Sequence, residues 1–97
     1  MDMTLICINS LKKILNNHFS DRLFSYDGYK EWAFCMENDG DKWLVYQAER
    51  GNHYDEVVCY SVLDACLHMI RKATCIASEI TILDKEFFAE ISGQKIA

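Results

Sequence analysis

The stretch Lys42-Trp43-Leu44-Val45-Tyr46-Gln47-Ala48-Glu49-Arg50-Gly51 decides the fold that this chain is expected to adopt. One face of it would carry Trp43, Val45, Gln47 and Glu49, and this period of two is typical of a β-strand. A turn signal, Asn38-Asp39-Gly40-Asp41, precedes the stretch, and a glycine ends it. We interpret it as the central strand of a sheet.

Further strands are expected on both sides of this one. The segment Glu31–Glu37 also alternates, with Trp32, Phe34 and Met36 on one face. Asp55–Tyr60 is another strand, and Arg22–Tyr26 is a candidate for a short first strand. Their order along the chain predicts an antiparallel meander of three to four strands.

Two helices are expected to cover this sheet. In Met3–Asn17 the apolar residues recur at helical spacing, and the predicted buried face consists of Leu5, Ile8, Leu11 and Leu15. A second helix opens at Ser61, where Ser-x-x-Asp ending at Asp64 resembles a capping box. Its predicted buried face consists of Leu63, Cys66, Leu67, Ile70 and Ala73.

The tail has two interpretations. Ile80, Leu83, Phe87 and Ile91 recur at helical spacing, whereas the β-branched run Glu79–Leu83 could be a strand before a short helix capped by Asp84. We favour the second interpretation, with Ser92-Gly93 ending that helix. The predicted fold class is α+β in a single domain, residues 1–97: an N-terminal helix, the antiparallel meander, a packed helix and a short C-terminal element.

The size and the cysteines narrow the class of protein. A chain of 97 residues fits one core and has little room for a large internal pocket. The five cysteines are an odd number without a C-x-x-C pair, which favours reduced thiols in a cytoplasmic protein. The apolar stretch Leu5 to Ile8 is too short for a secretory signal or a membrane span, so neither is expected.

The negative charge is concentrated in the middle of the chain. Between Asp27 and Glu56 lie eight acidic and three basic residues, which accounts for the net charge of −5. This balance argues against a nucleic-acid partner, because phosphate is bound by basic residues. It favours a basic protein partner. The alternative is a solvated acidic surface that keeps the protein soluble.

The sequence offers little sign of catalysis or metal binding. Cys59, Cys66, His68 and Cys75 fall in one region, but Cys66 and His68 are two apart on a helix and would point to different faces. None of His18, His53 and His68 forms a recognisable constellation with a cysteine. No phosphate-binding glycine loop, G-x-S-x-G or H-E-x-x-H motif is present. We therefore expect no catalytic residue, no metal site and no cofactor.

Aromatic residues are interleaved with the acids, and aromatics often carry the binding energy of interfaces. Each tryptophan, Trp32 and Trp43, could equally be core or contact, whereas Tyr29 and Tyr54 adjoin turns and are expected to be exposed. The interleaved aromatic and histidine residues are Tyr26, Tyr29, Trp32, Trp43, Tyr46, His53, Tyr54 and Tyr60.

Several stretches resemble small bacterial immunity proteins of polymorphic-toxin and contact-dependent growth inhibition systems. They are Asp27-Gly28-Tyr29, then Trp43-Leu44-Val45-Tyr46 running into Glu49-Arg50-Gly51, the strand Asp55–Tyr60 and the helix that carries Ala65-Cys66. The resemblance covers roughly residues 1 to 73. It implies a small cytosolic protein, not an enzyme, that binds and neutralises a cognate toxin domain, commonly a basic nuclease.

The expected function is therefore toxin neutralisation through an acidic, aromatic-containing surface. The candidate partner-binding residues are Tyr29, Glu37, Asp39, Asp41, Trp43, Glu49, Tyr54, Asp55 and Glu56. No nucleic acid or membrane is expected as a partner. The alternatives are a small regulatory or adaptor domain without a toxin partner and a small hydrolase built on paired carboxylates, for which so small a domain leaves little cleft.

Overall fold

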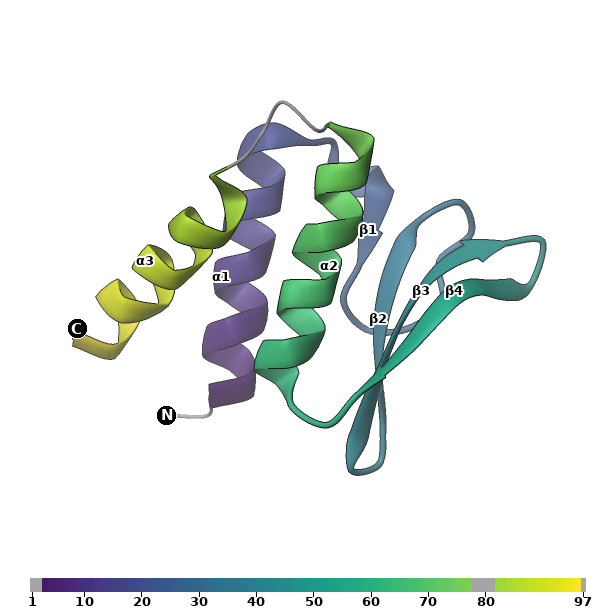
Figure 1. Ribbon diagram of the computed structural model, residues 1–97, viewed down its shortest axis with the longest axis horizontal. Coiled ribbons are helices and arrows are strands. Elements are labelled where there is room, and N and C mark those ends of the chain that lie inside the picture. The colour runs from purple at the N-terminus through teal and green to yellow at the C-terminus, as the bar shows by residue number, and fades with distance from the viewer. Residues whose placement is uncertain (1–2, 78–81, 97) are drawn as a thin grey trace.

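The computed structural model describes residues 3–77 and 82–96 and confirms the predicted α+β class. The elements are α1 (Met3–His18), the 3-10 helix η1 (Asp21–Leu23), β1 (Phe24–Ser25), β2 (Phe34–Asp39), β3 (Lys42–Glu49), β4 (Asn52–Cys59), α2 (Val62–Ile76) and α3 (Leu83–Ile96). Figure 1 shows the helices gathered on one side of the sheet, with α2 nearest to it. None of the helices among the described residues is long and apolar enough to cross a bilayer.

The sheet has the strand order β1-β2-β3-β4, and β2, β3 and β4 form the predicted antiparallel meander. The first strand differs from the prediction, because β1 pairs in parallel with β2, with Phe24 opposite Phe34. The turn at Asp27-Gly28 does not close a hairpin. Instead, the whole segment 26–33 brings the chain back so that β2 runs beside β1 in the same direction, which a two-residue hairpin cannot do. The sheet is therefore mixed.

Both hairpins have two-residue turns. In the β2–β3 hairpin Asp39 pairs with Lys42, and Gly40 adopts a positive φ of 68°. In the β3–β4 hairpin Arg50 and Gly51 have φ of 53° and 79°, and positive values at both positions define a type I′ turn. The third strand of the meander consequently begins at Asn52, earlier than the predicted Asp55, because so short a turn lets pairing resume at once.

A β-bulge interrupts β4. Gln47 pairs with Tyr54 while Val45 pairs with Val57, so both Asp55 and Glu56 lie opposite a single residue of β3. Asp55 has a φ of 52°, as expected where an extra residue turns the strand. Because of the extra residue, Tyr54 and Val57 lie on the same side of the sheet although they are three residues apart. Val57 therefore points toward the helices and packs against the main core.

The alternation predicted for β3 is confirmed by the two cores. Val45 lies in the main cluster with the helices, and Tyr46 and Ala48 lie in a smaller cluster on the outer face, the side of the sheet away from the helices. The main cluster draws on all three helices, through residues such as Leu11, Met69 and Phe87.

The predicted helix faces were wrong in part. Leu5 is 57% exposed, and the buried residues of α1 are Ile6, Cys7, Ser10, Leu11, Ile14 and Leu15. This face is turned and widened because α1 packs against both α2 and α3. In α2, Leu63 and Leu67 are only half-buried, and the buried residues are Ala65, Cys66, Met69, Ile70 and Ala73. That helix lies between α1 and the sheet and is therefore buried on two sides.

The tail is helical from Leu83 on, as both interpretations expected beyond Asp84, although the favoured one placed Leu83 in a strand. Leu83, Phe87 and Ile91 form the buried face of α3, which packs against α1. Of the strand predicted over Glu79–Leu83, residues 79–81 lie outside the described residues, and Leu83 is helical. The helix also continues past Ser92-Gly93, the predicted end, because one glycine costs only about 1 kcal/mol in a helix interior.

Candidate functional site

Three rings are stacked on the outer face of the sheet: Tyr29, Tyr46 and His53, here called the outer-face stack. The rings of Tyr46 and His53 are parallel within 3°, with centroids 3.6 Å apart. Tyr29 lies 5.9 Å from the ring of His53 and 6.4 Å from that of Tyr46. The cross-strand neighbours of these rings are small, since Tyr46 lies opposite Cys35 and His53 lies opposite Ala48. They leave room on the outer face for the rings to stack.

Each ring of the outer-face stack holds a carboxylate. The Tyr46 hydroxyl donates to Glu37 Oε1 at 2.6 Å, and the Tyr29 hydroxyl donates to Glu31. His53 Nδ1 lies 2.6 Å from Glu56 Oε1, and since an ionised carboxylate only accepts, this nitrogen carries the proton. The three carboxylates gather on the face because three ring donors hold them there.

The pKa values of the two tyrosines reflect these contacts. Burial, and then the hydrogen bond to Glu37, raise the pKa of Tyr46 far above its ordinary value. The hydrogen bond to Glu31 is the largest cause of the raised pKa of Tyr29. Both rings therefore remain neutral donors at physiological pH, and the carboxylates provide the negative charge of this face.

Hydrogen bonds join the segment 26–33 to β3 and to the β3–β4 turn. The Trp32 N–H donates to the Ala48 carbonyl at 3.0 Å, and the Ala48 N–H donates to the Ala33 carbonyl at 2.9 Å. At the far end of the strand, the Gly51 N–H donates to the Tyr29 hydroxyl at 2.7 Å. Through Tyr29 this segment is joined to the β3–β4 turn, so the outer-face stack and the segment form one unit.

The sequence left open whether Trp32 is a core residue or a contact residue. In the structure Trp32 is exposed. Its side chain is 63% exposed, and its backbone has a φ of 63°, which is unusual for a bulky residue. The predicted strand would have put it on the same face as Phe34, but β2 begins only at Phe34. The charged pair Lys30-Glu31 just before it was the one signal for a loop.

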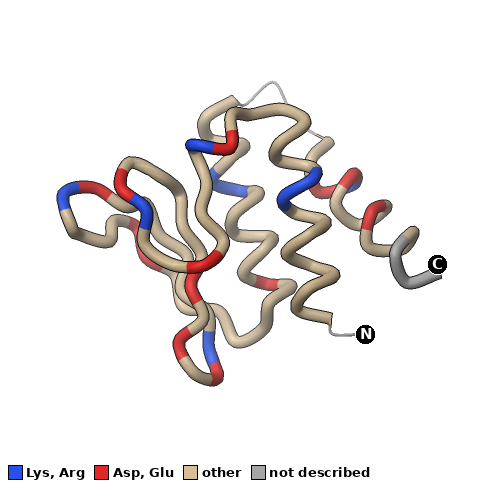
Figure 2. The backbone as a smooth tube through the Cα atoms, turned by 180° about the vertical axis from the view of Figure 1, so that it is seen from behind, with Lys and Arg blue, Asp and Glu red and all other residues tan. Residues whose placement is uncertain are grey.

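The structure brings together only some of the candidate partner-binding residues. Tyr29, Glu37 and Glu56 meet at the outer-face stack. Asp39 and Asp41 are exposed at the β2–β3 turn, and Glu49 is half-buried at the opposite end of β3. Figure 2 shows acidic residues at the turns of both hairpins.

The remaining candidates lie apart from the stack. Trp43 is partly exposed but packs against the main core on the helix-facing side. Tyr54 lies opposite Gln47, also on that side, and is 43% exposed. Asp55 is exposed at the bulge, where its carbonyl accepts a hydrogen bond from Lys72 Nζ at 3.0 Å.

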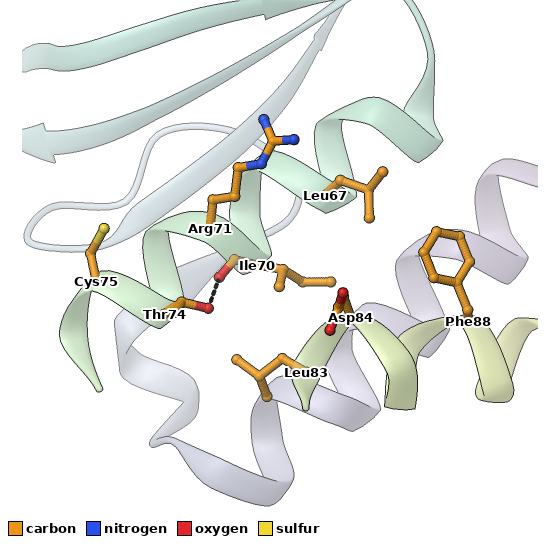
Figure 3. Close-up of a pocket in the computed structure, with 8 residues that line it drawn as sticks. All are labelled: Leu67, Ile70, Arg71, Thr74, Cys75, Leu83, Asp84 and Phe88. Carbon is orange, nitrogen blue, oxygen red and sulfur yellow. Dashed lines mark hydrogen bonds between the residues drawn. The ribbon is translucent and has the colours of Figure 1, made fainter. Parts of the chain in front are cut away.

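A hollow of about 660 Å³ lies between α2 and α3 (Figure 3). Its lining is mostly apolar, with Arg71 and Asp84 as its charged residues and with Thr74 Oγ1 donating to the Ile70 carbonyl at 2.9 Å. Among the described residues Asp84 is the one acid in this lining, so they do not supply the two facing carboxylates that glycoside hydrolysis needs.

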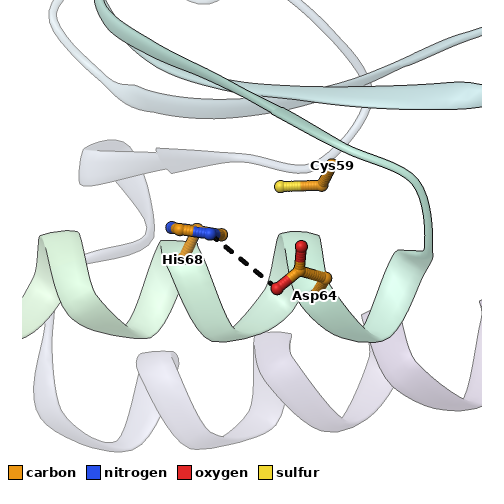
Figure 4. A group of neighbouring side chains, drawn as sticks. All are labelled: Cys59, Asp64 and His68. Atoms are coloured by element: carbon orange, nitrogen blue, oxygen red, sulfur yellow. Dashed lines mark ion pairs between the residues drawn. The ribbon is translucent and has the colours of Figure 1, made fainter.

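A second side-chain cluster joins the end of β4 to α2 (Figure 4). It consists of Cys59, Asp64 and His68, whose sulfur, oxygen and nitrogen atoms lie within 4.8 Å of one another. Burial, and then the negative charge of Asp64, raise the pKa of the Cys59 thiol to about 11. The sequence interpretation had paired Cys59 and His68 with other cysteines and had not considered Asp64.

Comparison of the chain with protein-family models, with curated proteins and with solved structures finds no significant match.

Proposed function

We propose that this protein binds a basic protein partner with the outer face of its sheet, and that the partner is a cognate toxin domain that it neutralises without catalysis. The observation that carries the proposal is the exposed Trp32, which follows Glu31 in the segment that carries Tyr29 and whose N–H is bonded to Ala48, the residue opposite His53 of the outer-face stack. Tryptophan and tyrosine are the residues that most often dominate the binding energy of protein interfaces.

The apolar part of this surface supplies affinity. Trp32 is 63% exposed and Tyr29 is 41% exposed, so both would lose contact with water in a complex. The Trp32 N–H donates to the Ala48 carbonyl and the Ala48 N–H donates to the Ala33 carbonyl, so the segment is already held in place. A preorganised anchor binds more tightly because less conformational entropy is lost on association.

The charged part of this surface selects the partner. Glu31, Glu37 and Glu56 present carboxylates around the rings, where a lysine or arginine side chain would meet both a negative charge and an aromatic face. The acids at the hairpin turns extend this potential and would steer a basic protein toward the sheet. A nuclease is a suitable partner, because its phosphate-binding surface is itself basic.

The cytoplasm is the proposed compartment. All five cysteines are free thiols, and four of them are buried. Free thiols persist where glutathione and thioredoxin keep them reduced. The same compartment holds the nucleic acid that an unneutralised nuclease would attack.

The test is to purify the protein with a tag from cells that carry its own locus, to identify what binds, and to co-express the two. We expect a basic toxin domain whose toxicity is lost on co-expression. A bound partner without toxicity would instead make this a regulatory or adaptor domain.

Substitution of the anchor tests the surface itself. We expect Trp32→Ala to weaken binding about 30-fold, or about 2 kcal/mol, as measured by calorimetry. The matched control is Tyr60→Ala, since Tyr60 is 79% exposed but lies in the link between β4 and α2. Equal binding by the Trp32→Ala variant and the unaltered protein would exclude the outer face as the interface.

A further inference from the structure

The topology places three potential metal ligands at one corner of the molecule. Cys59 is the last residue of β4, and Ser61 is the N-cap of α2, so only a short link separates strand and helix. Ser61 Oγ accepts a hydrogen bond from the Asp64 N–H at 3.1 Å, which fixes the first turn of the helix. His68 follows Asp64 by four residues and therefore lies on the same side of α2.

The three side chains converge on one point. Figure 4 shows the Cys59 sulfur directed toward Asp64 and His68, which lie along the helix beneath it. His68 Nε2 is 3.8 Å from Asp64 Oδ1, and all three ligand atoms lie within 4.8 Å of one another. Ligands at zinc–ligand distances of about 2.0–2.3 Å in a tetrahedron stand roughly 3.3–3.6 Å apart. Small side-chain rotations would therefore close the site.

We propose that Cys59, Asp64 and His68 bind a zinc ion, with water in the fourth position. Thiolate, imidazole and carboxylate are all zinc ligands, and a thiolate disfavours magnesium and calcium, which prefer oxygen alone. On binding, the thiol would release its proton to solvent, because the thiolate is the form that binds the metal.

The surroundings suit a site of this kind. Cys59 is buried, His68 is half-buried and Asp64 is exposed, so the site has a closed base and a side open to solvent for the metal and its water. The positive side chain of Arg71 would repel a cation at this site. It lies near enough to Cys59 to lower the pKa of the thiol. Arg71 is exposed, so its side chain can turn toward solvent.

The site is independent of the proposed function, because Cys59 faces the helices and the outer-face stack lies on the other side of the sheet. The competing explanation is an ordinary ion pair between Asp64 and His68, four apart on a helix, with a thiol buried beside it. An ion pair of this kind requires no metal, and the two explanations differ in what the protein does with added cobalt or zinc.

The experiment uses the full chain carrying Cys75→Ser, which removes the exposed thiol that could bind metal adventitiously. Cobalt(II) is titrated into the reduced protein, and the thiolate-to-cobalt absorption band is followed and then displaced with zinc. We expect one equivalent of cobalt with this band, and complete displacement by zinc.

Two further substitutions assign the ligands. In the Cys75→Ser background, Cys59→Ser should abolish the thiolate band, and His68→Gln should weaken metal binding at least about 100-fold, more than loss of an outer-shell partner costs. His68 is only half-buried, so His68→Gln keeps the test valid even if Cys59→Ser fails to fold, as judged by circular dichroism. Absence of the band in the Cys75→Ser protein, or an unchanged affinity in His68→Gln, would overturn the proposal.

Discussion

At the scale of single residues, a side chain's environment decides its role more than its type does. Trp32 and Trp43 both follow a charged residue, yet Trp43 packs against the core while Trp32 is exposed. The difference arises from backbone conformation, since Trp43 continues an extended strand and Trp32 has a positive φ. Sequence alternation describes extended backbone only, so it could not distinguish them.

The hydroxyl of Tyr46 is expected to contribute measurably to stability. Its ring is fully buried, and it donates to Glu37, which keeps access to water. Tyr46→Phe should therefore lower the free energy of unfolding by about 1 kcal/mol, the typical net value of such a hydrogen bond. Urea denaturation at pH 7 measures the change.

The control for this prediction is Tyr29→Phe, because the Tyr29 hydroxyl also bonds a carboxylate but its ring is exposed. The same hydroxyl also accepts from the Gly51 N–H, but Glu31 and Gly51 are both exposed, so water can replace the hydroxyl at each of them and we expect a loss below about 0.5 kcal/mol. A larger loss in Tyr29→Phe than in Tyr46→Phe would contradict the importance assigned to burial.

At the scale of elements, local signals predicted what each segment is, and tertiary contacts decided where its faces point. The alternation of β3 and the Ser61 cap of α2 were correctly predicted, because both depend on neighbouring residues. The exposure of Leu5 was not predicted, since the buried face of α1 is set by two helices far away in sequence. The alternation of residues within β1 does not show with which strand, or in which direction, it pairs, so its parallel pairing with β2 was not predicted.

The turn between β3 and β4 offers a way to stabilise the fold. Arg50 occupies the first central position of a type I′ turn at a φ of 53°, where asparagine is favoured and other side chains are strained. Arg50→Asn should raise the free energy of unfolding by about 0.5–1 kcal/mol. The measurement is the urea midpoint at an unchanged denaturant slope.

Arg22→Asn is the matched control, because it removes the same charge from the 3-10 helix η1, where the φ of Arg22 is not positive. We expect no gain from it. An equal gain in both variants would mean that charge, and not turn geometry, is responsible.

At the scale of the whole molecule, the charge distribution should govern how fast a basic partner associates. The exposed Asp39 and Asp41 extend the negative potential beyond the outer face, and Lys42 lies 3.8 Å from Asp39 without neutralising both. Reversing Asp39 and Asp41 to lysine should slow association about 10-fold at low salt and flatten its salt dependence. Stopped-flow kinetics with the purified partner measures both.

The control is reversal of Asp21 and Asp84, exposed acids outside the meander, which changes the net charge equally. If both pairs of substitutions slowed association alike, net charge alone would govern the rate. Unchanged kinetics in the Asp39 and Asp41 variant would remove the β2–β3 turn from the mechanism.

The candidate sites show how far a sequence can predict at this scale. The acidic and aromatic composition indicated a binding surface, and Tyr29, Glu37 and Glu56 were among the residues named for it. The stacking of Tyr46 on His53 could not be predicted, because it requires the pairing register of β3 with the bulged β4. The convergence of Cys59 with Asp64 and His68 likewise depends on how α2 folds back against the sheet.

The bulge in β4 has a consequence for the behaviour of many copies together. The strand β4 forms one open edge of the sheet, and an uninterrupted edge is a template on which another chain can add a strand and aggregate. At Asp55 and Glu56 the bulge breaks the regular row of edge groups and places two negative charges there. The opposite edge, β1, is only two residues long. A cell could therefore accumulate this protein to high concentration without its sheets joining edge to edge.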